Sequence, residues 1–301
     1  MNLKLNRRRE KARGSGVAPA AAGSSSLRLF RSFGVISRGA KGLFSITLLL
    51  GTTLAPGLCV GQSGTASSPQ NTLPPARLEP KAQQLLDGLL QALGGPAFLH
   101  FKTMTTRGRA FSIQDEKTVG MAPYTSATEY PDKRRFSYGK KEPVILINNG
   151  DHAWELDRYG LTAQFPEQAY RWQVSNRYSL ENLLRLRIHE PGMLIQAGGT
   201  DFVDNVPTQE IEITEPRGGR VRLDLNRQTL LPVRIIYRVQ NPKTLEWDEF
   251  ADTYGDYRSV QGIATPMHLA RWLNGERVSE TYRNEVRYDE DYPAGYFQPS
   301  N

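Results

Sequence analysis

Apolar and polar residues alternate with a period of two through much of the second half of the chain, from Met193 to Tyr288. In residues 233–239, for example, Val, Ile, Tyr and Val are separated by Arg, Ile and Arg. A period of two places successive side chains on opposite faces of a β-strand. Turn dipeptides divide the stretch: Gly218-Gly219, Asn226-Arg227, Asn241-Pro242 and Asn274-Gly275. Because such dipeptides join antiparallel neighbours, the stretch predicts a long antiparallel meander.

The part of the chain before this meander is expected to begin with a helix. Apolar residues at three- and four-residue spacings between Ala82 and Leu93 form one stripe, which Gly94-Gly95-Pro96 ends. Five short strands are expected after it, at residues 101–113, 126–130, 134–138, 143–148 and 152–157. The sequence Asn148-Asn149-Gly150-Asp151 predicts a tight hairpin turn between the last two strands.

A second helical region is predicted between the strands and the meander, from about Pro166 to His189. Proline suits the first turn of a helix. Ser179 suits the N-cap of a second helix, because apolar residues follow it at positions 183, 184, 186 and 188. Pro191-Gly192 ends the region.

The formal charge of +7 comes from the first 62 residues, which hold ten Lys or Arg and one acidic residue. The remaining chain has 28 basic and 30 acidic residues and is therefore close to neutral. Binding to nucleic-acid phosphates requires basic charge on the folded body. The composition therefore argues against a nucleic-acid partner.

Residues 1–61 have the parts of a basic leader with a secretory signal peptide. Arg38 and Lys41 precede an apolar run over residues 43–60, and Gly61 or Ala66 offers a cleavage position. The alternative is a single membrane anchor. The only cysteine, Cys59, lies in this run; its context suits lipidation poorly, and lipidation would tether the protein to a membrane. These residues predict an exported protein of the periplasm.

The remaining chain is expected to form a disordered linker and one domain. Residues 62–77 are rich in Ser, Pro and Gln, which is typical of disorder. Residues 78–301 suit a single β-rich domain.

No catalytic, cofactor or metal site is predicted. The four histidines lack a metal-ligand spacing, there is no Gly-x-Ser-x-Gly nucleophile turn, and no glycine pair precedes a phosphate-binding Gly-Lys-Ser/Thr. One basic cluster, Lys133-Arg134-Arg135 followed by Lys140-Lys141, fits either a solvated hairpin edge or contact with anionic lipid headgroups or a partner. We therefore expect a protein that is not an enzyme.

The order of helix, β-section, helices and long meander resembles the LolA/LolB-type superfamily of outer-membrane lipoprotein-sorting proteins. The local likeness is strongest in residues 228–239 (QTLLPVRIIYRV) and in residues 252–275 (DTYGDYRSVQGIATPMHLARWLNG), which include a Tyr-x-x-Val-x-Gly-x-x-x-Pro turn. The resemblance implies an α+β fold, mainly antiparallel β, in which helices pack in the concave side of a curved half-barrel sheet. It also implies transport by binding of lipid, or of a lipoprotein's acyl chains, in an apolar cavity.

Physical reasoning supports this class of protein, since the concave side of a half-barrel cannot be filled by its own side chains alone. Each buried CH₂ contributes about 0.8 kcal/mol, so acyl chains can displace a helix that plugs the cavity. The helix over residues 179–188 is either such a gate or a fixed part of the core. The expected lipid-binding residues lie on this helix and on the sheet: Leu183, Leu184, Ile188, Ile235, Tyr237 and Trp272.

The sequence predicts one of two functions. The first is a soluble, monomeric carrier or sensor of lipid or lipoprotein acyl chains. The alternative is a structural or interaction protein of the cell envelope that binds another envelope protein and no lipid.

Overall fold

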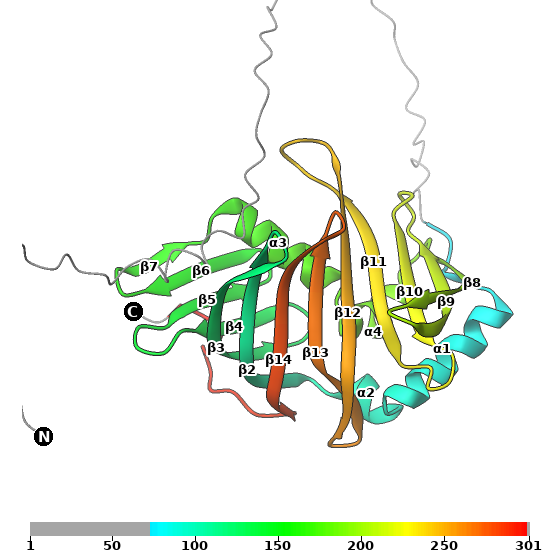
Figure 1. Cartoon of the computed structure of the whole chain (residues 1–301), viewed down its shortest axis with the longest axis horizontal. Helices are drawn as coiled ribbons and strands as arrows, with labels where there is room; N and C mark the ends of the chain where they lie inside the picture. Colours follow the sequence, from blue (N-terminus) through cyan, green and yellow to red (C-terminus); the bar gives the residue numbers. More distant parts are fainter. Residues whose placement is uncertain (1–72, 300–301) are drawn as a thin grey trace, which may run out of the picture.

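The computed structural model describes residues 73–299, which form a 14-stranded sheet with helices against one side (Figure 1). The expected leader, its cleavage positions and Cys59 lie outside the described residues. Between residues 73 and 299, no helix is long and apolar enough to cross a membrane. The fold is α+β and mainly antiparallel, as predicted.

Two meanders meet side by side to make the sheet. The strand order is β1-β8-β9-β10-β11-β12-β13-β14-β2-β3-β4-β5-β6-β7, and all neighbours are antiparallel except β1 and β8. The outermost strands, β1 and β7, do not pair with each other, so the sheet stays open. The first meander contains β8 (Leu194–Val203), β9 (Val206–Thr214), β10 (Arg220–Asn226), β11 (Pro232–Gln240), β12 (Trp247–Val260), β13 (Ile263–Leu273) and β14 (Glu276–Tyr288). The second contains β2 (Thr103–Gln114), β3 (Lys117–Glu129), β4 (Lys133–Tyr138), β5 (Val144–Asn149), β6 (His152–Asp157) and β7 (Gly160–Ala163).

The predicted turns close these hairpins for identifiable reasons. Asn274 and Gly275, between β13 and β14, both have positive φ, of 53° and 84°. Turns of this kind match the twist of antiparallel strands and favour Asn-Gly. At the seam between β14 and β2, the register shifts beside Arg283, and Gly108 faces it. A Cβ at Gly108 would lie 1.9 Å from the Tyr282 carbonyl oxygen, so glycine is required where the strands approach closely.

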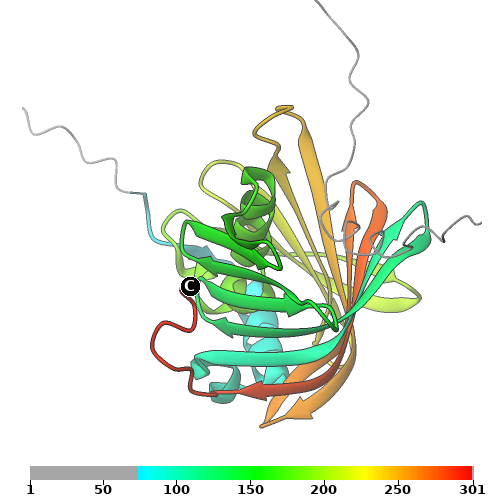
Figure 2. The same ribbon diagram turned by 90° about the vertical axis from the view of Figure 1, so that its left-hand side faces the viewer.

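The helices lie in the hollow of the curved sheet (Figure 2). They are α1 (Pro80–Leu93), α2 (Pro96–His100), α3 (Pro166–Arg177), α4 (Leu180–Arg185) and a 3₁₀ turn (Arg187–His189). Proline occupies the first turn of α1 and of α3, and the Ser179 side chain accepts a hydrogen bond from the Asn182 N–H at the start of α4. The helix positions therefore follow the predicted caps.

The main core lies between α1, α4 and the first meander. The predicted stripe of α1 is buried through Ala82, Leu86, Leu89 and Leu93. One face of the meander is buried against it through alternate residues, and the group includes Ile211, Ile213, Val221, Leu223, Leu225, Ile235 and Tyr237. The period of two in the sequence thus corresponds to one buried face of the meander.

Three expectations about boundaries need correction. The expected linker ends earlier than residue 77, because Pro74 accepts a hydrogen bond from the Gly192 N–H and Arg77–Leu78 form β1 against β8. β3 begins at Lys117 rather than near residue 126, and the short strand β7 was not expected. Residues 117–120 and 161–163 are mostly exposed, so no buried alternation marked them as strands.

Candidate functional site

The concave side of the sheet brings together five of the six residues expected to bind lipid. Leu183, Leu184 and Ile188 belong to the same buried cluster as Ile235 and Tyr237 of β11. Their exposed fractions are 0, 0, 5, 0 and 1% respectively. In the structure these side chains fill the hollow themselves.

Polar contacts on both sides of α4 hold it in this position. The Asn182 side chain donates to the carbonyl oxygens of Pro131 and Asn176, at 2.8 and 2.9 Å. Arg185 donates to the backbone carbonyls of Leu99 and Phe101. Just beyond α4, the buried Arg187 pairs with Glu215. Burial and these anchors favour the fixed-core alternative for this helix over the gate.

Trp272 does not share the surface of Ile235 and Tyr237. The register places Ile236, Ala251 and Trp272 side by side on β11, β12 and β13, whereas Tyr237 lies opposite Phe250. Residues directly opposite each other on antiparallel strands share a face, and neighbours along a strand point to opposite faces. Trp272 therefore lies on the convex face, and its expected place in the concave site is wrong.

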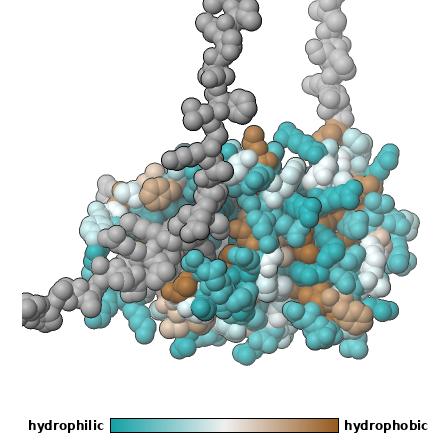
Figure 3. Space-filling view, turned by 45° about the horizontal axis from the view of Figure 1, so that its top comes forward, coloured by the Kyte–Doolittle hydropathy of each residue, from teal (hydrophilic) through white to brown (hydrophobic). Residues whose placement is uncertain are grey.

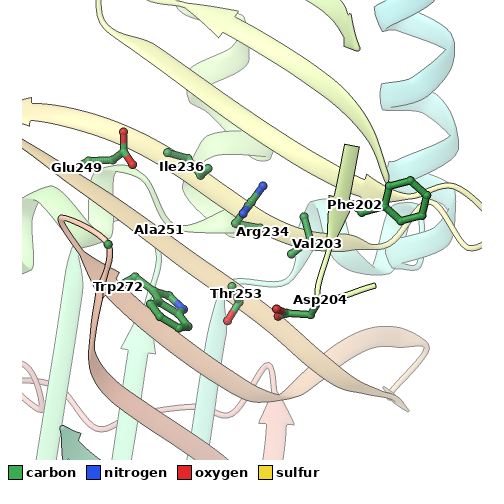
Figure 4. Close-up of a pocket in the computed structure, with 10 residues that line it drawn as sticks. Phe202, Val203, Asp204, Arg234, Ile236, Glu249, Ala251, Thr253 and Trp272 are labelled. Carbon is green, nitrogen blue, oxygen red and sulfur yellow. The ribbon is translucent and has the colours of Figure 1, made fainter. Parts of the chain in front are cut away.

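The convex face carries a shallow groove of about 360 Å³ around Trp272 (Figure 4). Ile236 and Ala251 form part of its floor, and Phe202 from the end of β8 lies at its side with 69% of its surface exposed. Arg234 also lines the groove and pairs with the buried carboxylate of Asp224 at 2.6 Å. The groove is separated from the concave side by the sheet.

Tyrosines line the concave side next to the apolar cluster. Burial, followed by the negative charge of Glu181, raises the pKa of Tyr130 and of Tyr257 well above the usual value. Burial, followed by the charge of Asp252, does the same for the pKa of Tyr254. These three rings pack against the core cluster but keep part of their surface accessible. The concave side therefore presents half-buried phenols next to the apolar cluster.

A charged pair lies on the same face of the sheet. Arg271 forms two hydrogen bonds with Asp252, both 2.7 Å long, and its side chain is 34% exposed. Burial lowers the pKa of the Arg271 guanidinium, but the charge of Asp252 has the larger opposite effect, so the pKa is raised. Asp252 lies opposite Ile235 in the register, so the pair is on the concave face. Arg271 is therefore a partly exposed guanidinium whose charge is matched by Asp252.

We expect the tyrosines of the concave side to destabilise the domain at alkaline pH. Burial raises the pKa of Tyr130, Tyr237, Tyr254 and Tyr257 above the value of 10.0. The unfolded chain therefore loses protons first, so their contribution to stability is complete below pH 10 and declines above it. Ultraviolet absorbance of phenolate should rise together with the loss of near-ultraviolet circular dichroism. Ionisation of all tyrosines near pH 10 in a folded domain would contradict this.

Helix α3 covers this side of the molecule with few buried contacts. Only Trp172 and Val174 of its residues are buried. Tyr170 donates to the Gln240 carbonyl at 3.0 Å, and Glu167 pairs with Lys243; both partners belong to the β11–β12 hairpin. The residue before the helix, Phe165, is 68% exposed. The face in Figure 3 is mostly hydrophilic, with small groups of apolar residues between charged ones.

The concave side combines apolar and polar chemistry. It offers apolar side chains, neutral phenols and guanidinium groups. Among residues 73–299, no group of three His, Cys, Asp or Glu side chains could hold a metal ion. His268, which lies on the other face, pairs with Glu280 at 2.7 Å and stacks on Tyr282.

The sequence analysis did not place the arginines and tyrosines on this surface. The cluster that contains Arg134 was expected to be either a solvated hairpin edge or a contact for anionic headgroups or a partner, and Arg134 alone of Lys133, Arg134 and Arg135 turns to the concave side. The tyrosines are spread over β11, β12 and the loop before β4, so no local motif unites them. Alternation within Lys133-Arg134-Arg135 separates the middle residue from its neighbours, but it does not say which of the two faces is concave.

Several solved structures have a similar fold. A DUF1329 family protein from Desulfovibrio piger has a TM-score of 0.49 and 11% identity, a lipoprotein-sorting protein domain from Vibrio parahaemolyticus 0.45 and 8%, and a LolA superfamily protein from Nitrosomonas europaea 0.43 and 13%. Each covers 72% of this chain and 97% of its own. No protein-family model matches the chain, and no curated protein matches it in sequence. At these identities and TM-scores the function must be argued from the residues of this chain.

Proposed function

We propose that the protein is an exported, non-enzymatic carrier or sensor that binds lipid, or the acyl chains of a lipoprotein, on the concave side of its half-barrel. The leader supports export, and the near-neutral domain supports a partner other than nucleic acid. The observation that carries the proposal is the half-buried surface beside the core. It combines apolar side chains with Tyr130, Tyr254 and Tyr257.

In this proposal the gate is α3 rather than α4. Lifting α4 would expose Leu183 and Leu184, which are fully buried, and break the anchors of Asn182 and Arg185. Lifting α3 exposes two buried side chains and breaks the hydrogen bonds of Tyr170 to Gln240 and of Asn176 to Pro131. It also breaks the ion pairs of Glu167 and Arg177, which lie at the surface and are worth about 0–1 kcal/mol each. Segments that open easily have few buried apolar contacts. An incoming acyl chain, at about 0.8 kcal/mol per buried CH₂, can offset that cost.

The test is lipid extraction and native mass spectrometry of the protein purified from its own cell envelope. We expect acyl species to co-purify at a stoichiometry near one per protein and to be released by organic solvent. Protein refolded in the absence of lipid should then take up a fluorescent fatty acid. Repeated recovery of a ligand-free protein that takes up no acyl probe would reject the carrier.

The convex groove favours the second candidate, an interaction protein of the envelope. Phe202 is 69% exposed beside it, and the indole N–H of Trp272 is buried without a hydrogen-bond partner. Cross-linking in the envelope with a probe at Phe202 would support this function if it captured one defined protein. The two functions use opposite faces of the sheet, so each can be tested without disturbing the other.

A further inference from the structure

Arg134 is a charged residue turned toward the concave side. The register pairs it with Thr128 of β3 and Asn148 of β5, and Thr128 pairs in turn with Met104, which is part of the buried core cluster. Directly opposite residues on antiparallel strands share a face. The guanidinium therefore projects to the side on which the helices and the tyrosines lie.

The partners of this guanidinium leave its charge uncompensated. It lies 5.5 Å from the centroid of the Phe136 ring and 5.8 Å from that of Trp172 on α3. One nitrogen donates to the Asn148 side-chain oxygen at 3.3 Å, and the buried Nε has no hydrogen-bond partner. Within residues 73–299, no carboxylate lies within ion-pair distance of Arg134. Burial, and to a smaller extent the charge of Arg271, lowers its pKa to about 9, so it still carries a proton at neutral pH.

Charges of both signs lie on this side, since the Glu181 carboxylate acts on the pKa values of Tyr130 and Tyr257. No carboxylate contributes to the shift in the pKa of Arg134, which comes from burial and Arg271. Arg283 donates to the Pro266 carbonyl at 3.1 Å and has no carboxylate within ion-pair distance in the described part of the chain. The charge of Arg283 lowers the pKa values of Tyr124 and Tyr257, whereas burial raises them, so Arg283 lies near these two rings. Arg271 is matched by Asp252. Burying a charge is costly unless it is paired, so an unpaired guanidinium on an accessible surface favours an anion there.

We propose that Arg134 is the centre of an oxyanion site that binds the phosphate or carboxylate headgroup of an acidic amphiphile, whose acyl chain lies on the adjacent apolar and tyrosine surface. This inference rests on the proposed lipid-binding function and specifies its ligand. Guanidinium groups suit such headgroups because their N–H donors match the geometry of two oxyanion oxygens. Trp172 joins the site to α3, so the headgroup lies beneath the proposed gate.

The test compares two probes with the same chain, oleoyl lysophosphatidic acid and mono-oleoylglycerol, which differ by a phosphate. We expect the unaltered protein to prefer the phosphate-bearing probe. Arg134→Gln should lower the affinity for that probe by about tenfold or more, because a charge-assisted hydrogen bond is lost. The affinity for mono-oleoylglycerol should stay the same. Arg134→Lys, which keeps the charge, should keep part of the preference. Unfolding in urea identifies any loss of folding in either variant.

Arg135→Gln is the matched control. Arg135 is the next residue on β4, and its guanidinium stacks on the Tyr296 ring at 5.3 Å on the other face. We expect this variant to change neither affinity. If Arg134→Gln and the unaltered protein bind both probes equally, the oxyanion site is wrong and the carrier stands. If the unaltered protein binds neither probe, the proposed function fails and the site with it. If inorganic phosphate competes as strongly as the lipid, the site binds a free anion and not an amphiphile.

Discussion

Leu184→Asp is expected to abolish the cooperative folding of the domain. The Leu184 side chain has no exposed surface and lies in the core cluster between α1, α4 and the first meander. An ionised carboxylate there has no partner, and burying it costs several kcal/mol in addition to the lost apolar contact. Domains of this kind have total stabilities of about 5–15 kcal/mol. The milder Leu184→Ala should cost about 2–5 kcal/mol and leave a folded protein.

The measurement is urea unfolding followed by circular dichroism, with Leu186→Asp as the matched control. Leu186 directly follows α4 and is 49% exposed, so the same charge there should change stability by less than about 0.5 kcal/mol. Lipid uptake by the Leu184→Asp protein should be lost together with its folding. A folded Leu184→Asp protein that has lost only uptake would show that α4 is the gate and not part of the core.

The strands of the first meander could be predicted because burial on one face leaves a signal in the sequence itself. Ile211, Leu223 and Ile235 are fully buried, while their neighbours Glu210 and Arg222 pair with each other on the other face. Local alternation and turn dipeptides then suffice to place each strand. Where a strand is mostly exposed, as at the start of β3 and in β7, this signal is missing.

The site was harder to predict because it depends on which residues meet across different strands. Trp272 follows a register shift next to Arg271, and its face relative to Ile235 is fixed only by the pairing of three strands. A change of one residue in register moves a side chain to the opposite face. Arg134 shows the same limit, since its orientation follows from β2 and β3 and cannot be read from a run of three basic residues. Alternation predicts that two faces exist but not which residues of distant strands share one.

The two helices of the second helical region show why an apolar sequence is a poor guide to a gate. Leu183 and Leu184 made the segment after Ser179 a candidate for a plug in an apolar hollow, but both side chains are fully buried in the core. α3 carries fewer apolar residues and buries only Trp172 and Val174. A gate must open at a low cost in free energy, so weak packing is the property that matters. Weak packing becomes visible only when the contacts of each helix are known.

Cross-linking α3 to the β11–β12 hairpin is expected to stop the uptake of lipid. Glu167 of α3 and Lys243 of the hairpin form an exposed ion pair, so cysteines at both positions can be joined by a short bifunctional maleimide. The single native cysteine, Cys59, can be replaced by serine beforehand. Once joined, α3 cannot swing away from the concave side, and the uptake rate of a fluorescent fatty acid should fall by at least about tenfold if lid opening controls entry. Stopped-flow fluorescence measures this rate.

A second cross-link at a matched surface ion pair separates gating from general rigidity. Arg158 and Glu142 form such a pair at 3.3 Å, and both side chains are about half exposed, beside the β6–β7 hairpin rather than on α3. Cysteines there, joined by the same reagent, should leave the uptake rate unchanged, as should the unlinked Glu167→Cys protein. Equal uptake by the α3-linked protein and these controls would mean that lipid enters without movement of α3. In that case the exposed edges of the open sheet, β1 and β7, would be the remaining routes to the concave side.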